Sequence, residues 1–313
     1  MSRVDDAEVV ALLLTQRLVD DGAPPLKASE FWGVLGAVPD LGALLGLGPE
    51  EVGQAAGVDA DMAARIVARL DQATSFAFAL DEVQQTGLRV LSALSPDYPS
   101  ALSEKLGRAA PPLLYALGDV GLLKREGLGI VGSRSVSEAG AEVARAAAAN
   151  AVTAGLGVLS GGAKGVDRLA MTAALDAGGH VVGVLADSLS RTARDPEVRR
   201  PVGDGLVCLC SPYKPTAGFT VANAMGRNKL IYALSTATLV VECEEGNGGT
   251  WAGAVEALRA KTAPVIAWAG PGAVPGNHAL VRLGARPLEC LEDLVGVCRT
   301  EPTPAPAQLG FSF

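Results

Sequence analysis

Three glycine-rich segments of the sequence carry side chains suited to binding phosphate. Gly132-Ser133-Arg134-Ser135 offers two hydroxyls and the forked donors of an arginine. Ser160-Gly161-Gly162-Ala163-Lys164-Gly165-Val166-Asp167 combines a lysine with free amides at a helix start. Glu245-Gly246-Asn247-Gly248-Gly249-Thr250 precedes another helix, which Asn247 or Thr250 could cap. Each segment alone is also an ordinary turn, but three in one chain indicate a phosphate site.

A fourth segment, Asn223-Ala224-Met225-Gly226-Arg227-Asn228-Lys229, holds two further cations. On a helix Arg227 and Lys229 would point about 200° apart and could not face one ligand. On an extended turn both would lie on one side. The sequence leaves these arrangements open, together with a solvated helix start that binds nothing.

Other kinds of site have less support in the sequence. Neither GxGxxG with a following acidic residue nor GxxxxGK[ST] occurs, which disfavours a standard dinucleotide fold and a P-loop NTPase. The five cysteines form no pair of CxxC motifs, so we interpret them as packed, reduced thiols and expect no metal. The two histidines lie far apart, and nothing supports a Ser/His/Asp or Cys/His catalytic arrangement. We expect no cofactor.

The elements that would position these segments alternate between short apolar runs and helix-length stretches. This pattern predicts an α/β fold with a doubly wound, mostly parallel, extended Rossmann-like sheet, and a small helical domain before it. In such sheets, ligands bind beyond the carboxyl ends of the strands. The predicted strands are 128–131, 156–160, 180–185, 206–209, 238–241 and 264–268, with helices at 137–154 and 251–261.

The same pattern along the 313 residues predicts the domain organisation. Residues 1–87 resemble a SAM or helix-hairpin-helix module. Such a hairpin can bind a DNA backbone, but its acidic residues favour packing against protein. We expect an extended linker ending in a strand at 88–119, the Rossmann-like domain at 120–290, and a helix end with a proline-rich tail at 291–313.

Composition and charge restrict the class of protein further. With 49% apolar residues and no apolar stretch of about 18, the chain should fold compactly without crossing a membrane. Its start lacks a signal peptide, so we expect a cytoplasmic protein. The net charge is −8, yet residues 110–290 hold 17 Lys+Arg against 15 Asp+Glu, so a local positive site remains compatible with it.

Taken in order, these motifs resemble the DNA-processing protein A (DprA/Smf) family. Its GSR turn resembles residues 132–134, and its S-G-x-A-x-G-[IV]-D loop resembles residues 160–167. AALDAGGHVVGVLADSL and GRNKLIYALSTATLVVE are similar to two further family stretches, and SPDYPSAL and PPLLYALGD fit its lead-in. The resemblance covers about residues 88–286.

This resemblance implies a non-enzymatic protein that binds single-stranded DNA, forms a homodimer and loads a strand-exchange recombinase during recombination and transformation. Arg134, Lys164, Arg227 and Lys229 would contact phosphates. The full set of expected DNA- or phosphate-binding residues is Gly132, Ser133, Arg134, Ser160, Gly161, Gly162, Lys164, Arg227, Asn228, Lys229, Gly248, Gly249 and Thr250.

Two alternatives remain open. The segment 247–250 is closer to a turn of the lysine-decarboxylase-like (LOG) nucleotide phosphoribohydrolases, which suggests a nucleotide sensor or a hydrolase using Glu256. Gln308–Phe313 resembles peptides that dock in the bacterial sliding clamp, which suggests an interaction hub. Chance occurrence, or packing of this hexapeptide on its own domain, would explain the same residues.

Overall fold

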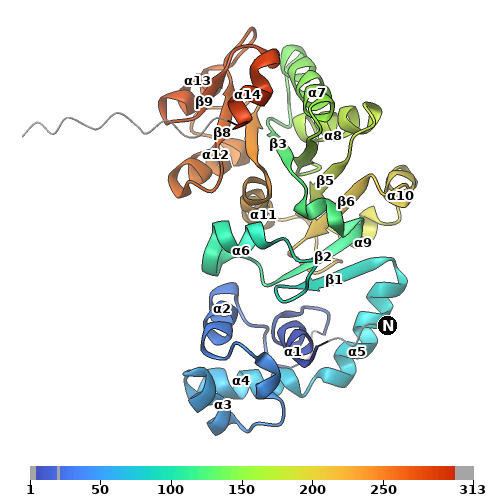
Figure 1. Ribbon diagram of the computed structural model, residues 1–313, viewed down its shortest axis with the longest axis vertical. Coiled ribbons are helices and arrows are strands. Elements are labelled where there is room, and N and C mark those ends of the chain that lie inside the picture. Colours follow the sequence, from blue (N-terminus) through green and yellow to red (C-terminus); the bar gives the residue numbers. More distant parts are fainter. Residues whose placement is uncertain (1–4, 20–21, 300–313) are drawn as a thin grey trace, which may run out of the picture.

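The structure, a computed structural model, describes residues 5–19 and 22–299 (Figure 1). The described residues between Asp6 and Gln85 form a group of helices that we call the helical unit. Its elements are α1 (Asp6–Thr15), α2 (Ala28–Ala37), the 3-10 helix η1 (Leu41–Leu44), α3 (Pro49–Ala56), α4 (Ala60–Leu70) and α5 (Ala73–Gln85). Phe31, Val34, Leu41 and Ile66 are fully or almost fully buried in its own apolar core.

Strands from the rest of the described chain form one sheet in the order β1-β2-β6-β5-β4-β3-β7-β8-β9. The pairs β1–β2 and β2–β6 are antiparallel, and every other pair is parallel. The strands are β1 (Leu88–Ser92), β2 (Leu113–Gly118), β3 (Gly127–Val131), β4 (Gly157–Ser160), β5 (Val181–Val184), β6 (Val207–Ser211), β7 (Ala237–Val240), β8 (Val265–Trp268) and β9 (Arg286–Leu288).

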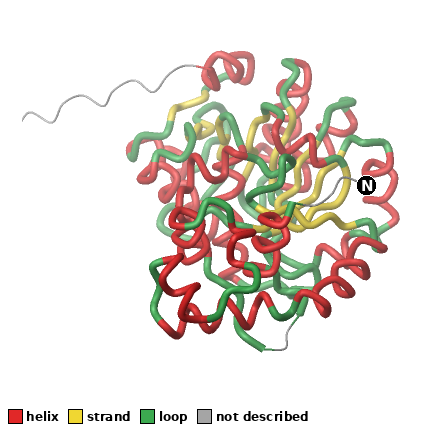
Figure 2. Tube along the Cα trace, turned by 60° about the horizontal axis from the view of Figure 1, so that its bottom comes forward, coloured by secondary structure: helices red, strands yellow, loops and turns green. Residues whose placement is uncertain are grey.

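Helices cover both faces of this sheet, so its strands run between two helical layers (Figure 2). The elements are α6 (Ser100–Leu106), α7 (Glu138–Thr153), α8 (Val166–Asp176), α9 (Leu189–Thr192), α10 (Pro196–Gly203), α11 (Val221–Leu234), α12 (Gly248–Ala260), α13 (Pro275–Arg282) and α14 (Leu294–Arg299), with 3-10 helices η2 (Gly107–Ala109), η3 (Val120–Lys124) and η4 (Leu291–Asp293). Ile130 of β3 packs toward α7 and α8, whereas Val131 packs toward α11 and α12. This alternation explains why the central strands are apolar on both faces.

The observed fold confirms the predicted α/β class. The six predicted strands and both predicted helices are present, with bounds that differ by at most three residues. No helix in the described part of the chain is long and apolar enough to span a bilayer.

Residues 88–119 differ from the expected linker with one strand. Residues 88–92 form β1 and pair with β2, and α6 lies between the two strands. The prolines suggested an extended connection, but Pro99 directly precedes α6, while Pro111 and Pro112 directly precede β2. The prolines therefore mark element boundaries. The division at residues 87, 119 and 290 stays a prediction, and the proline-rich tail lies outside the described residues.

Candidate functional site

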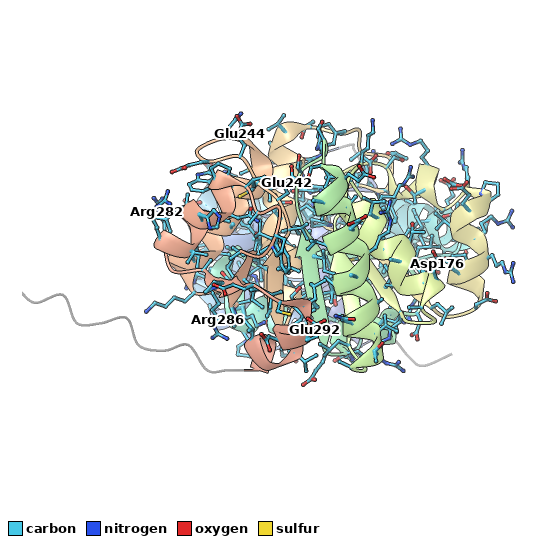
Figure 3. All side chains as sticks on the ribbon, turned by 90° about the horizontal axis from the view of Figure 1, so that it is seen from above. Asp176, Glu242, Glu244, Arg282, Arg286 and Glu292 are labelled. Atoms are coloured by element: carbon cyan, nitrogen blue, oxygen red, sulfur yellow. The ribbon has the colours of Figure 1, made fainter. Side chains whose placement is uncertain are left out.

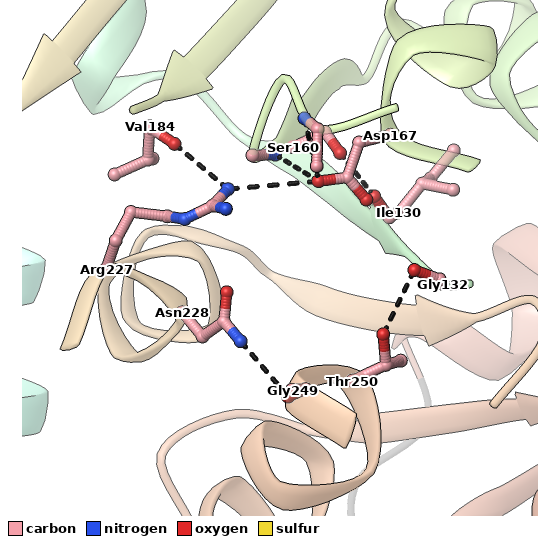
Figure 4. A network of polar contacts seen from close by, with 11 residues as sticks. Ile130, Gly132, Ser160, Asp167, Val184, Arg227, Asn228, Gly249 and Thr250 are labelled. Carbon is pink, nitrogen blue, oxygen red and sulfur yellow. Dashed lines mark hydrogen bonds and ion pairs between the residues drawn. The ribbon is translucent and has the colours of Figure 1, made fainter. Parts of the chain in front are cut away.

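A cavity of about 390 Å³ lies beyond the carboxyl ends of β3, β4 and β7. Parts of all four segments singled out in the sequence line it: residues within 131–134, 163–167, 219–232 and 243–250. Figure 4 shows the polar contacts that join these segments. Because parallel strands all end at one edge of the sheet, residues more than 100 positions apart meet there.

The mouth of the cavity carries an exposed arginine beside an exposed aromatic ring. Arg134 follows β3, and its guanidinium carbon lies 5.0 Å from the centre of the Phe219 ring, within cation–π distance. Phe219 is 50% exposed, so the pair is partly open to solvent. At Gly132 a β-carbon would lie 2.5 Å from the side chain of Val166, which explains the glycine in this close turn.

The loop after β4 is stabilised mainly by contacts within the protein. The hydroxyl of Ser160 donates to the carbonyl of Ile130, and the amides of Gly161 and Ala163 donate to Oδ2 of Asp167 at 3.1 and 3.4 Å. The Gly161 amide that we expected to bind phosphate is thus used by Asp167.

Four of the expected binding residues in this loop lie outside the cavity lining. These residues are Ser160, Gly161, Gly162 and Lys164, of which Ser160 and Gly161 are buried and the other two are exposed.

Arg227 lies in the wall of the cavity and is 96% buried. Its Nη1 donates to the carbonyl of Val184 at 3.1 Å and lies 3.8 Å from Oδ2 of Asp167 (Figure 4). Burial lowers the pKa of Arg227 and raises that of Asp167, while each charge favours the ionised form of the other. An arginine stays protonated even so, and Arg227 therefore places a positive charge beside the cavity.

The first turn of α12 forms another part of the cavity lining. The hydroxyl of Thr250 donates to the carbonyl of Gly132 at 3.0 Å, and Nδ2 of Asn228 donates to the carbonyl of Gly249 at 3.1 Å. These bonds tie α12 to the loop after β3 and to α11. Gly248 begins α12 at φ 78°, a left-handed conformation that favours glycine.

The structure places Lys229 away from the cavity. Residues 227 and 229 both lie in α11, so their side chains diverge, as the helical alternative required. Lys229 is exposed and forms an ion pair with Glu256 of α12 at 2.9 Å. Lys229 and Glu256 are both absent from the cavity lining, so the position of Glu256 does not support the hydrolase hypothesis.

Some residues at the cavity were not among the candidates from sequence. Phe219, Tyr232, Glu244 and Asp167 all line it, and only Asp167 had a signal, as part of the matched loop motif. Nε of Arg227 and the hydroxyl of Tyr232 are buried without a hydrogen-bond partner in the described chain. The described residues contain no group of three or more His, Cys, Asp or Glu arranged to hold a metal.

The fold is similar to two solved structures of DNA processing protein A. The protein from Streptococcus pneumoniae has a TM-score of 0.71 and 24% identity, with 94% of this chain and 98% of that chain covered. The protein from Helicobacter pylori has a TM-score of 0.56 and 20% identity over 67% of this chain and 94% of that chain, and its structure concerns its single-stranded DNA binding mode. At these identities the likeness shows the fold.

Curated relatives also match by sequence. Protein Smf of Synechocystis is 30% identical over 210 residues, which are 64% of this chain and 51% of the relative. The putative DNA processing protein DprA of Mycobacterium tuberculosis is 30% identical over 201 residues, 59% of this chain and 49% of the relative. The chain spans about half the length of these relatives. Residues 89–299, more than half of the chain, match the family model of DNA recombination-mediator protein A, and the protein belongs to that family.

Proposed function

We propose that this protein binds single-stranded DNA at the cavity and acts without catalysis in DNA recombination. The observation that carries the proposal is the exposed Arg134 guanidinium over the half-exposed Phe219 ring at the cavity mouth. An arginine can pair with a phosphate, and an aromatic face can stack on an unpaired base. The two groups together fit a strand whose bases are free of partners.

Local charge supports the same ligand despite the net charge of −8. A phosphate at the mouth responds mainly to charges within a Debye length of about 8–10 Å. Arg134 stands exposed there, and Arg227 lies in the wall at 3.8 Å from the carboxylate that partly neutralises it. The cavity lining also holds two carboxylates, Asp167 and Glu244, so the attraction for a polyanion is concentrated at the exposed Arg134 and should give modest, salt-sensitive affinity.

We propose further partners of this protein besides DNA. Membership of a recombination-mediator family supports a role in loading a strand-exchange recombinase and in transformation, with the protein as a homodimer. The solved structure of the Helicobacter pylori relative concerns its binding of single-stranded DNA, which supports single-stranded DNA as the ligand here. The sliding-clamp hypothesis rests on Gln308–Phe313, which lie outside the described residues.

The test is a fluorescence anisotropy titration of a labelled single-stranded oligonucleotide at two salt concentrations. Arg134→Ala should weaken binding about tenfold, because one charge-assisted contact is lost, and should reduce the salt slope by about 0.7. Phe219→Ala should weaken binding about tenfold through lost stacking. Arg259→Ala is the matched control, since Arg259 is exposed in the last turn of α12, whose first turn lines the cavity.

The same titration separates the alternatives. Affinity that does not change with salt, or equal losses in Arg134→Ala and Arg259→Ala, would contradict DNA binding at this cavity. Mononucleotides that compete as well as an oligonucleotide would instead favour a nucleotide-binding protein.

A further inference from the structure

One carboxylate at the cavity is poorly suited to a polyanion. Glu244 lines the cavity and is exposed, and no arginine or lysine pairs with it in the described chain. Oε2 of Glu244 accepts a hydrogen bond from Nδ2 of Asn247 at 2.8 Å, which orients the carboxylate. In Figure 3 Glu244 stands at the outer edge of the molecule, away from Arg282.

The other carboxylates in this region have partners. Glu242 accepts hydrogen bonds from the amide and hydroxyl of Ser137, and Glu245 pairs with Arg282 at 3.3 Å. Asp167, the second carboxylate of the cavity lining, accepts two amides and lies beside Arg227. Glu244 is thus an oriented, unneutralised acceptor beside a site for phosphates.

Such a carboxylate repels phosphate, and a donor on the ligand is needed to offset that repulsion. Among the bases, cytosine, adenine and guanine carry amino groups, and an acidic side chain accepts readily from an amino group. At the position of the cytosine 4-amino group thymine carries a carbonyl oxygen, which a carboxylate disfavours. Phe219 and Glu244 line the same cavity of about 390 Å³, so a base stacked on Phe219 would share that cavity with the carboxylate.

We propose that Glu244 determines base selectivity, so that the site prefers bases with an exocyclic amino group over thymine. This inference rests on the proposed binding of single-stranded DNA. Two unpartnered buried polar groups of the cavity lining, Nε of Arg227 and the Tyr232 hydroxyl, also indicate that the cavity is built for a polar ligand.

The experiment compares labelled 12-nucleotide oligomers of deoxycytidine and thymidine by anisotropy at one salt concentration. The wild type should bind the cytosine oligomer about tenfold more tightly. Glu244→Gln should reduce this ratio to about twofold or less, because the amide is a weaker, uncharged acceptor. Glu245→Gln removes the same charge one residue away, so it should raise both affinities slightly and leave the ratio unchanged.

A third oligomer isolates the amino group. It carries 2-pyrimidinone, which is cytosine without its 4-amino group, and the wild type should bind it about as weakly as the thymidine oligomer. Glu244→Gln should bind the cytosine and pyrimidinone oligomers within about twofold of each other.

The outcomes separate this inference from the proposed function. If the wild type shows no preference, or if Glu244→Gln raises all affinities without changing their ratio, Glu244 acts only as a repulsive charge and the inference is overturned. Binding would then still depend on Arg134. If no oligomer binds at all, both proposals are wrong.

Discussion

Gly161 is required by the side chain packed against it. A β-carbon at this position would lie 1.2 Å from Nη1 of Arg227 and 2.7 Å from Oδ2 of Asp167. The guanidinium cannot move aside freely, because Arg227 is buried and its Nη1 donates to the carbonyl of Val184. The backbone here is not left-handed, so the requirement comes from space alone.

Gly161→Ala should therefore lower the free energy of unfolding by about 3 kcal/mol, since it separates a buried ion pair. Urea unfolding followed by circular dichroism measures the change. Gly36→Ala in α2 is the matched control, because nothing lies within 4 Å of a β-carbon there; it should be neutral or stabilise by up to about 1 kcal/mol. Equal midpoints for wild type and Gly161→Ala would show that Arg227 has room to move.

The sequence allowed us to select Arg134 and the glycine-rich segments as candidates, because residue type and position after a strand already predict a phosphate-binding turn. It could not predict that Asp167 uses the Gly161 amide or that Glu256 pairs with Lys229. Such contacts depend on how distant elements pack. Glu244 and Phe219 were not selected from the sequence, because neither residue type is distinctive in its segment.

At the scale of elements, the extent of burial determined which helices and strands could be predicted from the sequence. The central parallel strands are buried on both faces and therefore read as continuous apolar runs. In β1 only part of the strand is buried, and its pairing with β2 across an intervening helix leaves no local signal. The start of α11 contains glycine and asparagines, which are weak helix formers, so tertiary contacts rather than propensity determine that helix.

Tyr115 of β2 connects the sheet to the helical unit. Its hydroxyl accepts a hydrogen bond from the amide of Arg17, just after α1, and burial raises the pKa of Tyr115 to about 12. The unfolded chain would lose this proton near pH 10. The raised pKa of Tyr115 therefore contributes its full stabilisation of the folded state below pH 10. This stabilisation is lost as the pH rises through about 12.

Tyr115→Phe should remove that pH dependence. At pH 7 the variant should lose about 1 kcal/mol of unfolding free energy with the hydrogen bond. Between pH 10 and 12 the wild type should lose up to about 3 kcal/mol more than the variant, whose other tyrosines are unchanged. Urea titrations at several pH values provide the measurement, and parallel curves for the two proteins would show that Tyr115 ionises equally easily when folded.

At the scale of the whole molecule, the helical unit lies against the β1–β2 end of the sheet (Figure 1). Leu12, Leu13 and Phe76 belong to the same buried cluster as residues of the sheet and of α7. Nε1 of Trp32 donates to the carbonyl of Ala110 at 2.8 Å, which adds a polar contact across the boundary. Since the predicted division at residue 87 crosses a shared core, the two parts should unfold together.

The tryptophans make this testable, because Trp32 lies in the helical unit while Trp251 and Trp268 lie in the α/β part. A variant with Trp251→Phe and Trp268→Phe reports on the helical unit and its boundary with the α/β part, and Trp32→Phe reports on the α/β part. Urea transitions of both variants, each followed by fluorescence and by circular dichroism, should show one midpoint per protein, whichever probe is used. Chains of this length often unfold in stages, so coincident midpoints would indicate that the two parts unfold together. A Trp32 signal that changes at lower urea than the dichroism of the same protein would instead establish residues 1–87 as a separately folding domain.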